Sequence, residues 1–180
     1  MKISNDIIEK LQPLKGMNLD VAYRITKENK LDVKQSGFVE NVIAMLLDRP
    51  LPKNDKGEDF KGLFEVKEVK VNFTKKGEMR TGGDTNISAY INSESNFFES
   101  NIWDKTNRIL IVCVNANRVI VDVRFFDGSA YSEQMKSDYE AIKEAKNLCR
   151  QNNKILVFKT GFNSIMLKGN TAIDMSESIL

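Results

Sequence analysis

The stretch DFKGLFEVK at residues 59–67 decides how the rest of the chain is interpreted. From residue 63 onward, charged and apolar residues alternate with the period of two that is typical of a β-strand. One face of the expected strand combines Glu65 and Lys67 with four apolar residues, Leu63, Val69, Val71 and Phe73. Charges within an apolar stripe are costly unless they are paired or bind a metal. The alternation therefore favours a functional site at the start of this strand.

Asp59 precedes the strand in a loop, so its carboxylate can converge with that of Glu65. Two such carboxylates can hold a hard divalent cation through oxygen. Lys67, on the same face as Glu65, can orient or deprotonate a water and neutralise phosphate charge. These groups suit metal-assisted hydrolysis of a phosphodiester, because the metal stabilises charge and supplies the nucleophile. The motif alone is weak, and the alternative is acid and lysine alternating on a wet strand face.

Histidine is absent from the 180 residues. This excludes Ser-His-Asp and Cys-His nucleophile pairs and histidine-ligated zinc or haem. A metal site must then be built from oxygen, which suits Mg²⁺ better than zinc. With 41% apolar and 29% charged residues, the chain has the composition of a globular protein, and its length predicts a single domain over residues 1–180.

The periodicity of the chain predicts an α/β (α+β) protein with a central mixed sheet flanked by helices. Helices are expected over residues 4–11, 19–26, 38–47 and 132–151. Strands are expected over residues 63–73, 85–91, 108–114, 119–126, 155–159 and 165–167, with a turn at 75–78. The domain would consist of a helical part (1–50), a catalytic sheet (51–126), and a helix with C-terminal strands that reads DNA (127–180).

Basic residues are unevenly distributed, although the net charge is only +2. Residues 145–173 contain no acid, and a second basic stretch covers residues 61–80. Such regions can be a phosphate footprint, and the alternative is a solvated lysine-rich surface. Residues expected to contact DNA are Arg108, Lys159, Asn163 and Lys168. Lys159 and Asn163 lie in a polar loop that could read base edges in a groove, or be a plain surface turn.

No apolar run approaches 18 residues, and the first residues lack the apolar core of a signal peptide. Cys113 and Cys149 have no C-x-x-C spacing and are expected to be reduced core thiols. These observations predict a soluble cytoplasmic protein without a membrane partner. Trp103 is expected to pack in the core, since duplex DNA offers no free base face to stack on.

These motifs resemble the MutH-type endonucleases, which comprise the strand-nicking enzyme of methyl-directed mismatch repair and related GATC-cutting type II restriction enzymes. They belong to the PD-(D/E)XK nuclease superfamily, so the resemblance implies a restriction-endonuclease-like fold. The similar segments follow one another along the chain at residues 16–19, 37–43, 59–67, 83–85 and 97–101, and then at Lys105 and Arg108. The Glu-x-Lys and Lys-x-x-Arg blocks are moderately specific together and weak separately.

The resemblance also implies roles for individual residues. Asp59 and Glu65 would ligate the metal, Lys67 would position the attacking water, and Lys105 would match an additional lysine near the scissile phosphate. Without the resemblance, Lys105 and Arg108 could merely keep the end of a core strand soluble.

Two features of the chain depart from the family pattern. The spacing from Asp59 to Glu65 is one residue shorter than in the family, which leaves Glu58 as an alternative to Asp59. The family's helix glutamate falls at Ala44, and Glu40 stands one turn earlier on the same helix face. Glu40 would take that supporting catalytic role, or the role is absent.

The sequence therefore predicts a Mg²⁺-dependent double-strand DNA endonuclease of the restriction type. It would recognise a short site, for which the resemblance suggests GATC, leave a 5′-phosphate and need no nucleotide cofactor. One alternative is a MutH-like enzyme that nicks one strand during mismatch repair. The others are a catalytically silent DNA-binding module and a nuclease for branched or damaged DNA. The sequence leaves open whether a single copy or a homodimer meets the DNA.

Overall fold

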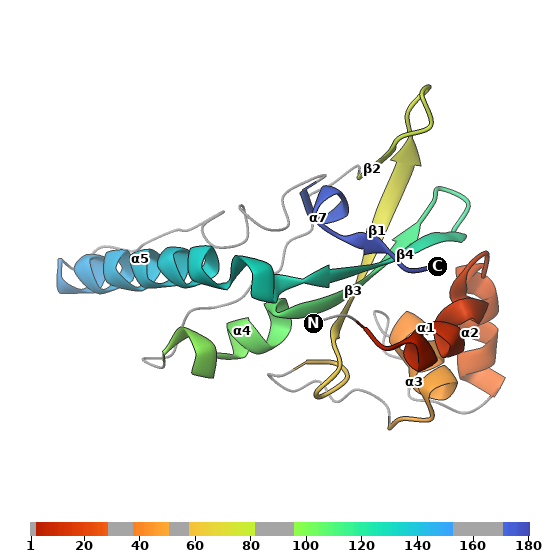
Figure 1. Cartoon of the computed structure of the whole chain (residues 1–180), viewed down its shortest axis with the longest axis horizontal. Coiled ribbons are helices and arrows are strands. Elements are labelled where there is room, and N and C mark those ends of the chain that lie inside the picture. The colour runs from red at the N-terminus through yellow and green to blue at the C-terminus, as the bar shows by residue number, and fades with distance from the viewer. Residues whose placement is uncertain (1–2, 29–37, 51–57, 82–95, 153–170) are drawn as a thin grey trace.

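A five-stranded mixed sheet lies at the centre of the protein (Figure 1). The computed structural model describes residues 3–28, 38–50, 58–81, 96–152 and 171–180. The sheet order is β2-β1-β3-β4-β5, with β1 Glu65–Phe73, β2 Met79–Thr81, β3 Arg108–Val114, β4 Ile120–Asp127 and β5 Glu177–Ser178. Strands β1 and β3 are parallel, and the other neighbours are antiparallel. The predicted mixed sheet with helices is thereby confirmed.

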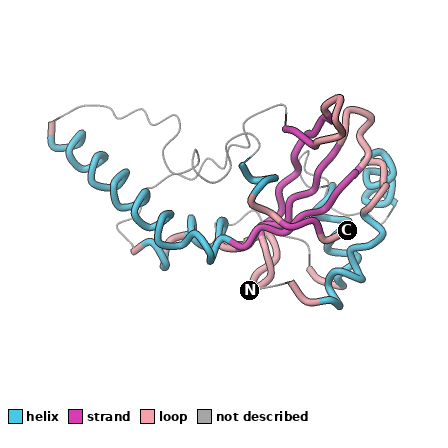
Figure 2. Tube along the Cα trace, turned by 45° about the horizontal axis from the view of Figure 1, so that its top comes forward, coloured by secondary structure: helices cyan, strands magenta, loops and turns pink. Residues whose placement is uncertain are grey.

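Helices lie on both sides of this sheet. The α-helices are α1 Asn5–Leu11, α2 Leu19–Glu28, α3 Phe38–Leu47, α4 Asn101–Thr106, α5 Ser132–Gln151 and α7 Thr171–Asp174. Short 3₁₀ turns are η1 Gln12–Leu14, η2 Phe97–Glu99 and η3 Gly128–Tyr131. Helices α1, α2 and α3 gather on one side of the sheet, whereas α5 projects away from it on the other (Figures 1 and 2).

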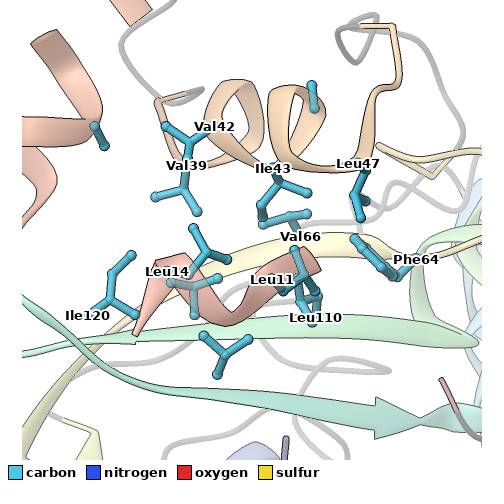
Figure 3. Close-up of a cluster of buried hydrophobic side chains, with 14 of the residues drawn as sticks. Leu11, Leu14, Val39, Val42, Ile43, Leu47, Phe64, Val66, Leu110 and Ile120 are labelled. Atoms are coloured by element: carbon cyan, nitrogen blue, oxygen red, sulfur yellow. The ribbon is translucent and has the colours of Figure 1, made fainter. Parts of the chain in front are cut away.

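Strand β3 divides the core into two layers because its side chains alternate between the two faces of the sheet. Leu110, Val112 and Val114 pack against the N-terminal helices, where they meet Leu14 and Ile43 (Figure 3). Every second residue of β3 is therefore buried on the face of the sheet that α1, α2 and α3 cover.

The second layer lies under α5 and η2. Ile109, Ile111 and Cys113 of β3 pack there with a cluster of buried side chains that includes Phe97, Met135 and Tyr139. Trp103 packs against this cluster, with its ring centroid 5.3 Å from that of Phe97. The prediction that Trp103 packs against the core is confirmed, although its side chain is only partly buried.

Several predicted elements have nearly the bounds expected. The structure places a helix at Phe38–Leu47, a strand at Arg108–Val114 and a helix at Ser132–Gln151. The turn at residues 75–78 is closed by the Thr74 N–H, which donates to the Glu78 carbonyl at 2.9 Å. The strands predicted at 85–91, 155–159 and 165–167 lie outside the described residues.

The prediction that the first strand begins at residue 63 is wrong by two residues. Residues 60–64 form a tight turn instead, and Leu63 packs against the cluster under the N-terminal helices. Phe73, at the other end of β1, is 55% exposed because it lies next to the hairpin turn. Of the four apolar residues assigned to the face of Glu65, only Val69 and Val71 are buried with the second layer.

No helix in the described part of the chain is long and apolar enough to cross a membrane.

Candidate active site

A tight turn delivers Asp59 to the first residue of β1. The backbone N–H of Phe60 donates to the Phe64 carbonyl at 3.0 Å, and that of Phe64 donates back to the Phe60 carbonyl at 3.2 Å. Gly62 has φ +77°, in the left-handed region that glycine enters without steric penalty. The chain therefore reverses direction between Asp59 and Glu65, which brings two residues six positions apart side by side.

Reciprocal hydrogen bonds hold the two carboxylates. The backbone N–H of Asp59 donates to Glu65 Oε2 at 3.2 Å, and the backbone N–H of Val66 donates to Asp59 Oδ2 at 2.9 Å. Glu65 is only 1% exposed. Each acid is thus held by a main-chain donor from the segment that carries the other acid, which fixes their mutual orientation.

Two lysines meet the same oxygen of Glu65. Lys67 Nζ lies 2.6 Å from Glu65 Oε1, and Lys105 Nζ lies 3.5 Å from it. Lys105 comes from α4, which directly precedes β3, and the parallel register pairs Glu65 with Ile109 of that strand. The parallel pairing of β1 and β3 therefore brings together residues 40 positions apart. The structure places four of the predicted site residues, Asp59, Glu65, Lys67 and Lys105, in one cluster.

Burial raises the pKa of the Asp59 carboxyl, and the nearby charge of Glu65 raises it further. The hydrogen bond from Val66 and the ammonium groups of Lys67 and Lys105 act in the opposite direction. The charge of Glu65 thus opposes ionisation of Asp59, and a bound cation would favour the ionised form of Asp59.

Glu40 of α3 lies within electrostatic reach of this cluster. Burial raises the pKa of Glu40 to about 7, the charge of Asp59 adds to the effect, and the charge of Lys67 opposes it. Ala44, one turn later, is buried among apolar side chains. Of positions 40 and 44, only Glu40 therefore carries an ionisable side chain that interacts electrostatically with Asp59 and Glu65.

The donor set of the site fits Mg²⁺. This ion is usually held by one or two carboxylates and completes its octahedron with waters and substrate phosphate. Asp59 and Glu65 supply two carboxylates. Within residues 3–28, 38–50, 58–81, 96–152 and 171–180, no group of three or more acidic, cysteine or histidine side chains is placed to hold a metal. A metal at this site would therefore depend on water or substrate for its remaining ligands.

Glu58 does not replace Asp59 in this cluster. Its side chain is turned to Arg108, with Glu58 Oε1 2.8 Å from Arg108 Nη2, and its other oxygen accepts the Gly62 N–H at 2.7 Å. No local pattern in the sequence connects this pair, because 50 residues separate its members. Both residues are site neighbours that sequence reasoning did not connect.

The remaining residues expected to bind DNA, Lys159, Asn163 and Lys168, lie outside the described residues, as do residues 83–85 of the family pattern. Arg108 lies beside the turn that carries Asp59, where its guanidinium donates to Glu58 and to the Gly62 carbonyl.

The fold and site together define an α+β protein with a cluster of two carboxylates and two lysines at the start of a sheet strand. No protein-family model matches this chain, and no curated protein matches it. The resemblance to the MutH-type endonucleases accordingly rests on the residues quoted for it.

Proposed function

We propose that this protein is a Mg²⁺-dependent endonuclease that hydrolyses phosphodiester bonds of double-stranded DNA at a short recognition sequence. The observation that carries the proposal is the convergence of Asp59 and Glu65 with Lys67 and Lys105. Acids and lysines from a turn, a strand and a helix meet in one place, which chance alternation on a solvated strand would not require.

The chemistry follows from these groups. Mg²⁺ bound by Asp59 and Glu65 would stabilise developing negative charge and lower the pKa of a bound water. The chain has no histidine to act as a base. Lys67 is suited to orient the attacking water, because its ammonium lies 2.6 Å from Glu65, one of the two proposed metal ligands. Lys105 is suited to neutralise the scissile phosphate. Glu40 would support the cluster from α3.

The finer features of this proposal come from the family resemblance. They are restriction-type cleavage, GATC as the recognition sequence and a 5′-phosphate product. The DNA contacts proposed for Lys159, Asn163 and Lys168 come instead from the acid-free stretch of the sequence, whereas the guanidinium of Arg108, the fourth expected contact, is bonded to Glu58 and the Gly62 carbonyl. Nicking in mismatch repair is the alternative within this class. We place the activity in the cytoplasm, in keeping with Cys113 as a free buried thiol.

One observation favours a second candidate, a catalytically silent DNA-binding module. Both lysines are directed at the same oxygen of Glu65, so the buried carboxylate has cationic partners without any metal. An ion-pair cluster of this kind can persist as structure alone.

A plasmid assay tests the proposal. Supercoiled plasmid is incubated with the protein in Mg²⁺, in Ca²⁺ and in EDTA, and the ends of any products are mapped. We expect cleavage in Mg²⁺ at a defined sequence, and loss of cleavage in Glu65→Gln. Glu28→Gln, at an exposed position of α2, is the matched control and should cut normally. Salt-sensitive binding without cleavage in any divalent metal would favour the silent module.

A further inference from the structure

Glu58 and Arg108 form a closed network around the turn that carries Asp59. Glu58 Oε1 meets Arg108 Nη2 at 2.8 Å, and Glu58 Oε2 accepts the Gly62 N–H at 2.7 Å. Arg108 Nη1 donates to the Gly62 carbonyl at 2.8 Å. One arginine and one glutamate therefore satisfy both polar backbone groups of the glycine at which the chain reverses.

This pair is too well enclosed to be an ordinary surface ion pair. The Glu58 side chain is 7% exposed and that of Arg108 is 23% exposed. Exposed pairs contribute little, whereas a buried acid that loses its partner is strongly unfavourable. Arg108 Nε also donates to Asn107 Oδ1 at 3.2 Å, which orients the guanidinium plane. Its three nitrogens thus have partners within the protein.

The pair also joins the two segments from which the site is assembled. Glu58 lies next to Asp59 in the chain, and Arg108 follows Lys105 by three positions at the start of β3. The ion pair between Glu58 and Arg108 therefore holds the turn that carries Asp59 against the α4–β3 junction that carries Lys105.

We infer that Glu58 and Arg108 are positioning residues that hold the turn at residues 59–64, so that the carboxylate of Asp59 stays aligned with that of Glu65 for metal binding. This inference rests on the proposed function as far as the metal is concerned. It gives Arg108 a role that needs no contact with DNA, and it assigns Glu58 a role distinct from that of a metal ligand.

Arg108→Lys is the main test, because it keeps the charge and removes the planar fork that reaches two acceptors at once. Amide hydrogen exchange of Gly62 and Val66 should become at least about fivefold faster, while that of Val112 in the core stays unchanged. The Val66 amide is informative because it donates to the Asp59 carboxylate. Arg118→Lys, in an exposed ion pair with Asp20, is the matched control and should leave these amides unchanged.

Metal binding gives a second readout that does not depend on cleavage. In calorimetric titrations with Mg²⁺, Arg108→Lys should weaken binding about tenfold, as expected for loss of a group that orients a metal ligand. In cleavage assays, kcat should fall while KM for DNA is unchanged. Glu58→Gln should show the same pattern more mildly, and combining it with Arg108→Lys should add little, because both changes open one network.

The outcomes are distinguishable. Unchanged exchange of Gly62 and Val66 together with unchanged Mg²⁺ affinity in Arg108→Lys would overturn the inference. A higher KM with a smaller salt dependence of DNA binding, and no change in exchange, would also overturn it and make Arg108 a phosphate contact. If exchange responds as expected but the wild-type protein neither binds Mg²⁺ nor cuts DNA, the positioning of the turn is supported and the proposed nuclease function fails.

Discussion

The two halves of β1 use one face of the same strand in opposite ways. Near its start, this face carries Glu65 and Lys67, and farther along it carries Val69 and Val71, which are 5% and 1% exposed. Residues 65–70 of β1 pair in parallel with β3, and Val71 pairs antiparallel with β2, so both halves belong to the same sheet. The apolar half needs only neighbouring apolar side chains. The charged half needs partners brought from other segments of the chain.

This difference indicates why the charged half is informative about function. Replacing a buried ion pair with well-packed apolar residues is often neutral or stabilising. The second half of β1 shows that an apolar solution is available on this very face. Keeping a nearly inaccessible carboxylate beside two lysines, at 2.6 and 3.5 Å, therefore favours a chemical purpose over a purely structural one.

The largest effect is expected from Lys67→Ala in the charged half. This change removes the closer ammonium group from Glu65, and cleavage should fall by at least about a thousandfold while DNA binding persists through other phosphate contacts. Initial rates of plasmid cleavage in Mg²⁺ measure the effect. Lys70→Ala, at an exposed position on the other face of β1, is the control. Cleavage at the wild-type rate by the Lys67 variant would show that this half of the strand is not the catalytic site.

The next prediction concerns Cys113, which lies opposite Val69 in the apolar half. Burial raises the pKa of the Cys113 thiol to about 12, the charge of Asp122 adds to this, and Arg124 opposes it. Because the thiolate is the reactive form, alkylation at pH 8 should be up to about a thousandfold slower than for an unperturbed thiol. In a Cys149→Ser background, iodoacetamide labelling followed by mass spectrometry measures the rate.

The same labelling in guanidinium chloride is the control for Cys113, since unfolding restores an ordinary thiol. Equal rates in the native and unfolded protein would mean that the apolar half of β1 and its neighbour on β3 are open to solvent. The contrast between the two halves of the strand would then be lost.

Local periodicity predicted the elements whose residues form one continuous pattern. The apolar run of Arg108–Val114 and the helical stripe of Phe38–Leu47 were predicted with their observed bounds. Helix α4 was missed because it is only six residues long and has no apolar stripe. Its start is marked by Ser100, whose side chain accepts from the Trp103 N–H. A helix this short depends on capping and packing more than on its own periodicity.

The candidate site was predictable in its residues but not in its assembly. The spacing of Asp59, Glu65 and Lys67 suggested a cluster, and the structure brings these residues together. The ion pair of Glu58 with Arg108 could not be predicted, because pairing across 50 residues depends on the parallel register of β1 and β3. The error at Leu63 has a local cause. The apolar and charged residues alternate from Leu63 onward, but the turn around Gly62 delays the start of the strand to Glu65.

A smaller effect is expected from truncation in the apolar half. Val71→Ala should lower the free energy of unfolding by about 1–3 kcal/mol, because the lost methyl groups leave a void that the core fills only partly. Phe73→Ala, two positions later and 55% exposed, is the control and should change stability by less than about 0.5 kcal/mol. Urea unfolding followed by circular dichroism measures both. Similar losses at the two positions would mean that Val71 is not part of the packed layer.

The smallest effect concerns Glu40, which lies near the charged half of β1. Two ammonium groups contact Glu65. The pKa of Glu40, in contrast, is raised from 4.5 to about 7, mainly because its carboxyl is buried. The folded protein then holds a proton that the unfolded chain releases, so stability from this group is full below pH 4.5 and is lost as the pH rises toward 7.

Glu40→Gln removes this loss. Without metal, in EDTA, the variant should gain up to about 1 kcal/mol relative to the wild type between pH 5 and pH 8. Each pKa unit corresponds to about 1.4 kcal/mol, and solvent around this half-buried side chain screens part of the effect. Urea unfolding at several pH values measures the gain, and Glu28→Gln at an exposed position of α2 is the control. Parallel pH profiles for Glu40→Gln and the wild type would show that Glu40 does not share the electrostatic environment of Asp59. The charged half of β1 would then receive no support from α3.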